Sequence, residues 1–419
     1  MGEPLNNTID SGEGISRSKR LWMAAVLGTL AAFGPLSIDM YLPALPNIAQ
    51  DFHTNPSLVQ LSLTFFLLGL SSGQLLAGPL SDVRGRRLPL LIGLVIYFVV
   101  SLLCVFSPSI WALIVLRFIQ GLAGSAGIVI SRAIVRDLYS GPELTKFFAL
   151  LALVNGVAPI LAPVMGAQLL KIVPWQGVFI VLSLIGLLMF FVVFFGLPET
   201  LRDDRRSAGG IKNTIMTFKN LIFDRSFIGY ALVQGLVFAG MFAYISGSPF
   251  VVQNIYGASA QMFSLIFAIN GVGIMIASQT TGRLAGRIQE SKLFVFGLCM
   301  SFFGGIVLLV LLLFHANLFL ILLPLFFVVS SVGVVSTAGF SLAMQKQGKS
   351  AGSASALLGV LSLAMGAIVA PLVGIGGEHT AIPMGIVIVC VGTGAVLSYF
   401  FLVHRSSSIT KDTSSSLSS

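Results

Sequence analysis

The sequence carries very little charge for its length. Only 9% of its 419 residues are charged, whereas an ordinary soluble domain has about 25% charged residues. The mean hydropathy is +0.97, so most of the molecular surface cannot face water. We therefore exclude a soluble globular enzyme, a disordered protein and a nucleic-acid-binding protein.

Residue types that serve as metal ligands or nucleophiles are also scarce. The three cysteines, Cys104, Cys299 and Cys390, lie in separate apolar runs, and the four histidines share no metal-ligand spacing. Gly348-Lys349-Ser350 resembles the end of a phosphate-binding loop, but Ala343 stands where that loop needs a glycine. We therefore predict no catalytic residue, no metal site, no cofactor and no ATP site, and we expect that the chain is not an enzyme.

Long apolar runs are what the sequence has in abundance. A helix needs about 20 mostly apolar residues to cross the hydrocarbon core of a bilayer, and twelve such runs follow one another along the chain. Their approximate bounds are residues 21–46, 57–80, 88–106, 111–133, 147–170, 177–197, 227–252, 259–284, 293–314, 317–343, 352–375 and 381–403. We predict an all-α integral membrane protein with twelve transmembrane helices in a lipid bilayer.

One longer polar segment divides these helices into six and six. It runs from Pro198 to Ser226 and is too short to form a further domain. The predicted organisation is an N-terminal tail (1–20), a six-helix bundle (21–197), a central linker (198–226), a second six-helix bundle (227–403) and a C-terminal tail (404–419).

The two predicted bundles share short patterns at similar offsets. Ala162-Pro163 in the fifth run recurs as Ala370-Pro371 in the eleventh, and Gly78-Pro79-Leu80 recurs as Gly282-Arg283-Leu284. Because six spans is an even number, the halves would have the same orientation. Parallel repeats of this kind place a ligand site at their interface near the midplane of the membrane.

Basic residues predict how the chain is oriented. With the N-terminus inside, all of the 24 lysines and arginines except Arg117 and Lys171 lie at inner segments. Basic residues are enriched in cytoplasmic loops. We therefore expect both termini and the linker to be cytoplasmic, and we attribute the net charge of +9 to this bias rather than to an acidic partner.

Two charges fall inside predicted spans. They are Asp39 in the first run and Arg117 in the fourth, and each costs about 2.5–3.5 kcal/mol at a helix centre on insertion scales. An apolar environment favours the neutral acid and a nearby cation favours the carboxylate, so a carboxyl group between them can exchange a proton near neutral pH. Asp39 and Arg117 are therefore our candidates for proton coupling. Interfacial solvation of Asp39 and a structural hydrogen bond from Arg117 to backbone carbonyls or to Gln120 remain open alternatives.

A third group of charges lies between the second and third spans. Gly78, Asp82, Gly85 and Arg86 belong to the run Gly-Pro-Leu-Ser-Asp-Val-Arg-Gly-Arg-Arg. Gly85 permits a tight turn, and an acid with arginines can pair across neighbouring helix ends. We predict that this run acts as a latch at the inner seam of the halves.

These residues resemble a known family. Residues 78–87 are similar to the loop signature of the major facilitator superfamily, Gly-x-x-x-Asp-Arg-x-Gly-Arg-Arg, except that Val83 replaces the usual basic residue. Residues 116–121 resemble its fourth-span signature, Arg-x-x-Gln-Gly. The proline-rich fifth-span signature of its antiporter branch is similar to residues 156–167, with Gly156, Pro159, Pro163 and Gly166.

Two further runs resemble one type within that family. Residues 35–46 and the segment Arg136-Asp137-Leu138-Tyr139 are similar to the bicyclomycin-resistance (Bcr/CflA) type of drug:proton antiporter. The resemblance implies a bacterial cytoplasmic-membrane exporter that exchanges protons for small drugs, such as bicyclomycin-like, sulfonamide or chloramphenicol-like compounds. We expect it to function as a monomer.

The resemblance also implies roles for single residues. Asp39 matches the first-span acid of the family, which is implicated in proton coupling or in recognising cationic substrates, and Arg117 matches the fourth-span arginine implicated in proton transfer. Asp82 and Arg86 match the inner latch, with Asp137 as a partner. The fifth-span signature is linked to antiport.

A drug cavity needs apolar walls with a few polar groups. Aromatic and methionine side chains adapt to varied apolar ligands. The candidate substrate-binding residues, all open to the alternative of ordinary helix packing, are Asp39, Tyr41, Tyr230, Gln234, Phe238, Met241, Tyr244 and Asn270.

The same fold allows a second function. A proton-linked importer or exporter of a metabolite, such as a sugar, an amino acid or a polyamine, would have the same twelve spans, because fold does not determine direction or substrate. The fifth-span signature favours export over import.

Overall fold

The computed structural model describes residues 17–139, 141–201, 219–345, 347, 351–377 and 379–404. Within these ranges the chain is helical, without a β-strand, and a single isolated bridge joins Ala285 to Ile288. The all-α prediction is therefore confirmed. Residues 1–16, 202–218 and 405–419 lie outside the described residues, and with them most of the predicted tails and linker.

The first half of the chain forms the helices up to α8. In order they are α1 (Arg17–Ala31), α2 (Phe33–Asp39), a short 3-10 turn η1 (Leu42–Ala44), α3 (Leu45–Asp51), α4 (Pro56–Arg84), α5 (Arg87–Val105), α6 (Ile110–Leu138), α7 (Gly141–Leu169) and α8 (Gln176–Gly196).

The second half forms the helices from α10 onward. In order they are α10 (Arg225–Phe250) with its π-helical end η3 (Val251–Ile255), α11 (Ala260–Leu284), α12 (Glu290–Leu313), α13 (Leu318–Met344), α14 (Ala351–Val369) with η5 (Ala370–Gly376), and α15 (Ile382–Ser398) with η6 (Tyr399–His404).

Short polar residues set where several of these helices begin. The side chains of Asn55, Ser109, Ser259 and Asn317 each accept a hydrogen bond from a backbone N–H in the first turn of α4, α6, α11 and α13. Such caps satisfy donors that a helix start leaves without partners. At the other end of α4, Gly85 takes a φ of 85°, which glycine adopts without steric cost.

Among the described residues, eleven helices are long and apolar enough to cross a membrane, and a twelfth span is broken. Leu21–Ala31 and Phe33–Asp51 together form that span, with a bend of 46° between them. Pro35 lies just after the bend and has no N–H to donate to the carbonyl of Ala31, which explains the break. The prediction of twelve spans is confirmed, and the bend is a feature that the apolar run alone did not predict.

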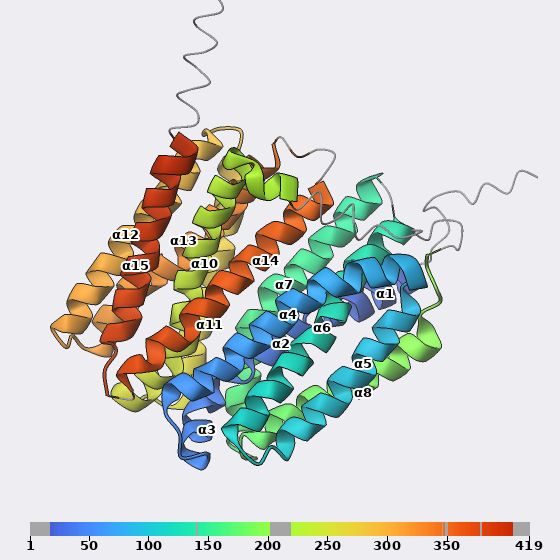
Figure 1. The fold of residues 1–419 in the computed structure, drawn as a ribbon, viewed down its shortest axis with the longest axis horizontal. Coiled ribbons are helices and arrows are strands. Elements are labelled where there is room, and N and C mark those ends of the chain that lie inside the picture. Colours follow the sequence, from blue (N-terminus) through green and yellow to red (C-terminus); the bar gives the residue numbers. More distant parts are fainter. Residues whose placement is uncertain are drawn as a thin grey trace, which may run out of the picture.

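The helices form two groups that lie side by side (Figure 1). In the first half α4 packs on α6 and α5 packs on α8, while in the second half α12 packs on α13 and α10 packs on α14. The halves meet where α7 packs on α11 and where α4 packs on α14. Any cavity between the halves is therefore bordered by these four helices.

The bundle has two ends, which we name by the chain. The terminal face is the end at which α1 begins and η6 ends, at the top of Figure 1, and the far face is the opposite end, where α3 lies. Helices α4 and α6 begin at the far face and end at the terminal face, whereas α7 and α10 run the other way.

Hydrogen bonds join the halves near the far face. In each of six bonds, a side chain of one half donates to a backbone carbonyl of the other. The bonds are Ser57 to Pro371 (3.3 Å), Gln60 to Ser246 (3.0 Å), Thr64 to Ala367 (2.9 Å), Gln253 to Pro43 (3.4 Å), Gln261 to Ala167 (2.9 Å) and Ser264 to Pro163 (2.9 Å). All twelve residues lie in the far-face portions of their spans, so the structure is closed at that face.

Candidate functional site

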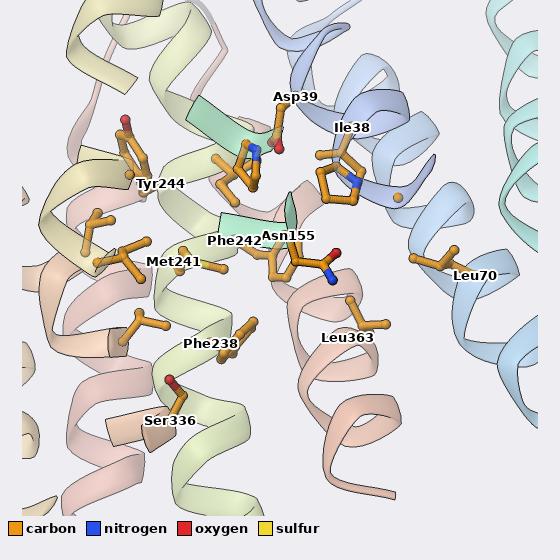
Figure 2. A pocket seen from close by; sticks show the side chains of 18 of the residues that line it. Ile38, Asp39, Leu70, Asn155, Phe238, Met241, Phe242, Tyr244, Ser336 and Leu363 are labelled. Carbon is orange, nitrogen blue, oxygen red and sulfur yellow. The ribbon is translucent and has the colours of Figure 1, made fainter. Parts of the chain in front are cut away.

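A cavity of about 460 Å³ lies between the two halves. Its walls come from α1, α2, α4, α6 and α7 of the first half and from α10, α11, α13 and α14 of the second. Figure 2 shows side chains from both halves pointing into this space, with Asp39 on one side and Phe238, Met241 and Tyr244 on the other. This cavity therefore lies where the sequence predicts a ligand site, at the interface of the two halves.

The two walls of the cavity differ in chemistry. The first half supplies the charged and most of the amide-bearing side chains, Asp39, Gln74, Arg132 and Asn155. The second half supplies mainly apolar and aromatic side chains, and its polar groups are Tyr244, Asn270 and Ser336. A ligand that fits both walls must be apolar over much of its surface and must present polar groups toward the first half.

Asp39 is the last residue of α2, where the broken first span passes the cavity. Only 5% of Asp39 is exposed, and Figure 2 shows its side chain directed into the cavity. Across from it, the Tyr244 hydroxyl accepts a hydrogen bond of 2.9 Å from the Asn270 amide, and the Tyr244 ring stacks on Phe267. A carboxyl group in such a place is poorly solvated, and protonation removes the charge that is costly to bury.

Arg117 is completely buried in α6 and does not line the cavity. Its Nη1 donates to Gln120 Oε1 at 2.6 Å, as the structural alternative in the sequence suggests, and its Nη2 donates to the carbonyl of Ser37 at 2.9 Å. Ser37 precedes Asp39 by two residues on α2. Arg117 therefore contacts the backbone that carries Asp39 from the side opposite the cavity.

Aromatic rings enclose the guanidinium of Arg117. Its Cζ lies 4.2 Å from the ring centre of Phe66, 4.7 Å from that of Tyr41 and 5.8 Å from that of Phe179. A cation over an aromatic face is stabilised electrostatically, and more strongly when it is shielded from water. This enclosure offsets part of the cost of burying Arg117 and fixes its position.

The loop between α4 and α5 holds a cluster of charges at the terminal face. Arg86 donates from Nε to Asp137 Oδ2 at 2.8 Å and contacts Asp82 through Nη1. The backbone N–H groups of Arg86 and Arg87 donate to the Glu199 carboxylate at 2.8 and 3.0 Å. Four of these five residues belong to the first half and Glu199 follows α8, so in this structure the predicted latch joins α4, α5, α6 and the segment after α8 rather than the two halves.

Hydrogen bonds shift the pKa values of two members of this cluster, Arg86 and Glu199. Burial alone would lower the pKa of Arg86, but its bonds to Asp137 and Asp82 outweigh burial and raise that pKa above its ordinary value. Burial alone would raise the pKa of Glu199, but bonds from backbone N–H groups outweigh it and lower that pKa. Both groups are therefore held in their charged forms.

The proline-rich signature of α7 lies along the first-half wall. Pro159 lines the cavity, and the carbonyl of Pro163 accepts the bond from Ser264 of the second half. A Cβ added to Gly166 would lie 2.1 Å from the carbonyl oxygen of Met40, so only glycine permits α7 to approach the turn after Asp39 this closely. Gly156 has open space in front of it and no such constraint.

Not all predicted substrate-binding residues reach the cavity. Asp39, Phe238, Met241, Tyr244 and Asn270 line it, whereas three others do not. Tyr41 is buried behind α2, where its hydroxyl bonds to Ser62 at 3.0 Å; Tyr230 packs on Phe294; and Gln234 is buried near Gly339.

Four polar lining residues are absent from the sequence-based candidates. They are Gln74 on α4, Arg132 on α6, Asn155 on α7 and Ser336 on α13. Arg132 could have been predicted, because it is a charged residue inside the apolar run 111–133. The sequence analysis instead assigns it to the basic residues that set the orientation of the chain.

Similarity to known proteins agrees with this geometry. The model of the Major Facilitator Superfamily matches residues 27–371. The chain is 47% identical over 389 residues to the uncharacterized MFS-type transporter YdgK of Bacillus subtilis (strain 168), covering 92% of this chain and 96% of that protein. It is 32% identical to the bicyclomycin resistance protein homolog of Haemophilus influenzae, covering 90% of this chain and 95% of that protein.

The fold is also similar to that of a solved structure. A bacterial homolog to the human lysosomal transporter Spinster, in an inward-facing and unoccupied conformation, superposes with a TM-score of 0.76 and covers 95% of this chain and 99% of its own. The sequence identity is 14%, so this likeness concerns the fold alone.

Proposed function

Because this chain belongs to the major facilitator superfamily, and so is a multi-pass membrane transporter, we propose that it is a proton-coupled antiporter. In this proposal it exports small amphipathic drugs or toxic compounds from the bacterial cytoplasm by alternating access. The observation that carries the proposal is Asp39, a buried acid on the wall of an otherwise largely apolar cavity between the two halves.

Asp39 is the proton-coupling group in this proposal. A carboxylate in the cavity attracts a cationic or hydrogen-bond-donating drug, whereas the protonated acid does not, so proton and drug compete for the same residue. Exchange follows if the proton arrives from one face and the drug from the other. Transport in this proposal needs no ATP hydrolysis, because the proton gradient provides the driving force.

Arg117 positions Asp39 in this proposal. Its bond to the Ser37 carbonyl and its aromatic enclosure support a fixed geometry for the segment that carries the acid. The role in proton transfer implied by the family resemblance is therefore indirect in this proposal, through the position of the backbone that carries Asp39.

We assign the terminal face to the cytoplasm, following the distribution of basic residues. The closure of the far face then supports an inward-facing state, in which the six bonds between the halves close the outer side. In the opposite state those bonds must break while the halves close at the terminal face. The cluster of Arg86, Asp82 and Asp137 is the candidate latch for that second state.

The second-half wall favours drugs over sugars. Sugar recognition needs many directed hydrogen bonds, whereas Phe238, Met241 and Phe242 offer apolar and aromatic contacts to the ligand. The import of a hydrophilic metabolite is therefore less compatible with this cavity than the export of amphipathic compounds.

A reconstituted transport assay tests the proposal. Purified protein in proteoliposomes should accumulate bicyclomycin-like, sulfonamide or chloramphenicol-like compounds when an inside-acidic pH gradient is imposed, and an efflux-deficient host expressing the chain should gain resistance to the same compounds. Accumulation that is unchanged when a protonophore collapses the gradient would contradict proton coupling.

A further inference from the structure

Arg132 is a charged residue on the cavity wall that proton coupling through Asp39 does not use. It lies on α6 about 9 Å inside the helix end at Leu138, by the rise of an α-helix. An arginine at this depth that faced lipid could extend its side chain to the headgroups, but Arg132 lines the cavity instead. Its guanidinium therefore faces whatever enters from the terminal face.

No protein group neutralises Arg132 within the described residues. It makes no hydrogen bond or ion pair there, and the charged neighbour close enough to act on it is Arg136, another cation. The acid of the cavity, Asp39, lies deeper, near the far-face end, with Asn155 and Gln74 at intermediate depth by their positions on α7 and α4. Arg132 thus presents free N–H donors at the end of the cavity nearer the terminal face.

The opposite wall also offers no counter-charge. The second-half residues that line the cavity nearest the terminal face are Phe238, Ile274, Val332, Ser336 and Leu363, and none of the lining residues of that half is acidic. Figure 2 shows Phe238, Ser336 and Leu363 gathered at one end of the cavity, away from Asp39. If the halves close at the terminal face during transport, Arg132 loses water, and burying a charge without a partner is costly.

We propose that Arg132 is the recognition site for an anionic group of the substrate, so that amphipathic compounds bearing a carboxylate or a similar acid belong to its substrate class. Transport of such compounds rests on the proposed function, whereas their binding at Arg132 does not depend on it. An arginine fork matches a carboxylate with two parallel hydrogen bonds. The apolar part of such a compound would lie against the aromatic wall of α10.

Equilibrium binding tests this directly with nalidixate, an amphipathic carboxylate, and its ethyl ester, which lacks the charge. Purified full-length protein in phosphatidylcholine nanodiscs should bind nalidixate about tenfold to a hundredfold more tightly than the ester, the range that one charge-assisted hydrogen-bonded pair supplies. Arg132→Gln should abolish this preference, and Arg132→Lys should retain part of it.

Arg136→Gln is the matched control, because it removes the same charge one helical turn away, at a residue that does not line the cavity. It should leave the preference unchanged, and thermal unfolding of each variant checks that it is folded. Absent nalidixate binding, no preference for nalidixate in the wild type, or equal weakening of both ligands by Arg132→Gln would overturn the proposal.

Two further results separate the alternatives. If phosphatidylglycerol in the nanodisc displaces nalidixate from the wild type, the anion at Arg132 is a lipid headgroup, and the assignment to a substrate is wrong. Because binding is measured without a proton gradient, a retained preference with no gradient-driven transport would contradict the proposed antiport and leave this inference standing.

Discussion

The two halves of the molecule share a six-span plan but differ where they face each other. The first half contributes both charged residues of the cavity, Asp39 and Arg132, whereas the second contributes an aromatic wall around Phe238 and Phe242. The terminal-face loops differ in the same way. Arg86 pairs with acids in the first half, while Glu290 in the second accepts bonds from neutral side chains.

This difference suggests a division of tasks between similar frameworks. In the proposed function, charges that take up a proton or hold a conformation need a fixed setting, and the first half provides it through the bonds of Arg117 to the segment before Asp39 and of Arg86 to Asp137. A wall that fits varied apolar ligands needs adaptable contacts without such a fixed setting. Substitutions in the first half should therefore alter coupling and turnover, and those in the second half should alter substrate preference.

The largest effect is expected for Asp39→Asn. This variant keeps the shape of the side chain but cannot exchange a proton, so proton-driven export in proteoliposomes should fall to background. Asn270→Ala removes a bond to Tyr244 in the second half and should weaken export only severalfold, because a neutral hydrogen bond contributes about 1 kcal/mol. Equal losses in the two variants would break the comparison between the halves.

The next effect is expected for Arg117→Lys. Lysine keeps the charge but loses the planar fork that bonds Gln120 and Ser37 and stacks between rings. Loss of one charged hydrogen bond costs about 1.5–3 kcal/mol, so the unfolding temperature should fall by several degrees and export by about tenfold or more. Tyr41→Phe keeps the ring and loses only the bond to Ser62, so it should change the unfolding temperature and export far less.

A smaller effect is expected from the charge cluster at the terminal face. Arg86→Ala and Asp82→Asn should each slow turnover by about tenfold while leaving equilibrium drug binding unchanged, because no residue of the cluster lines the cavity and the cluster acts on the change of conformation. Glu290→Gln removes a charge from the corresponding region of the second half and should slow turnover less. Loss of binding in Arg86→Ala with an unchanged balance of conformations would contradict the role as a latch.

The smallest effect concerns the stability contributed by Glu199. Its pKa is lowered in the folded protein, so its contribution is fully present above the unfolded value of about 4.5 and is lost as pH falls through the folded pKa. Because Glu199 is partly exposed, we expect Glu199→Gln to cost about 0.5 kcal/mol at pH 7. Thermal unfolding at several pH values should show this difference shrinking below about pH 4.5, and a difference that grows there would contradict the account.

The sequence predicts the frame of the molecule well. The predicted run 88–106 corresponds to α5 (Arg87–Val105), and the predicted run 177–197 corresponds to α8 (Gln176–Gly196). Length, hydropathy and turn residues determine such bounds, because a span must match the thickness of the bilayer. Asp39 and Asn270 were also found from sequence, since polar groups in apolar runs are costly and rare.

The direction in which each side chain points could not be predicted in the same way. Transmembrane helices are apolar on all sides, so a sequence gives the depth of a residue but not the face of the helix that meets the cavity. Tyr230 and Gln234 share a helix with Phe238 yet face packed neighbours. The enclosure of Arg117 combines Tyr41, Phe66 and Phe179 from distant parts of the chain, which no local pattern reveals.

Drug-induced proton release from detergent-solubilised protein tests the central claim most directly, namely that the first half carries the proton and the second half fits the drug. The wild type and the second-half variant Phe242→Ala should release the same number of protons at saturating drug, although Phe242→Ala should need a higher drug concentration. Asp39→Asn should release none while remaining folded. Undiminished proton release by Asp39→Asn, or a reduced proton count in Phe242→Ala at saturation, would contradict the account.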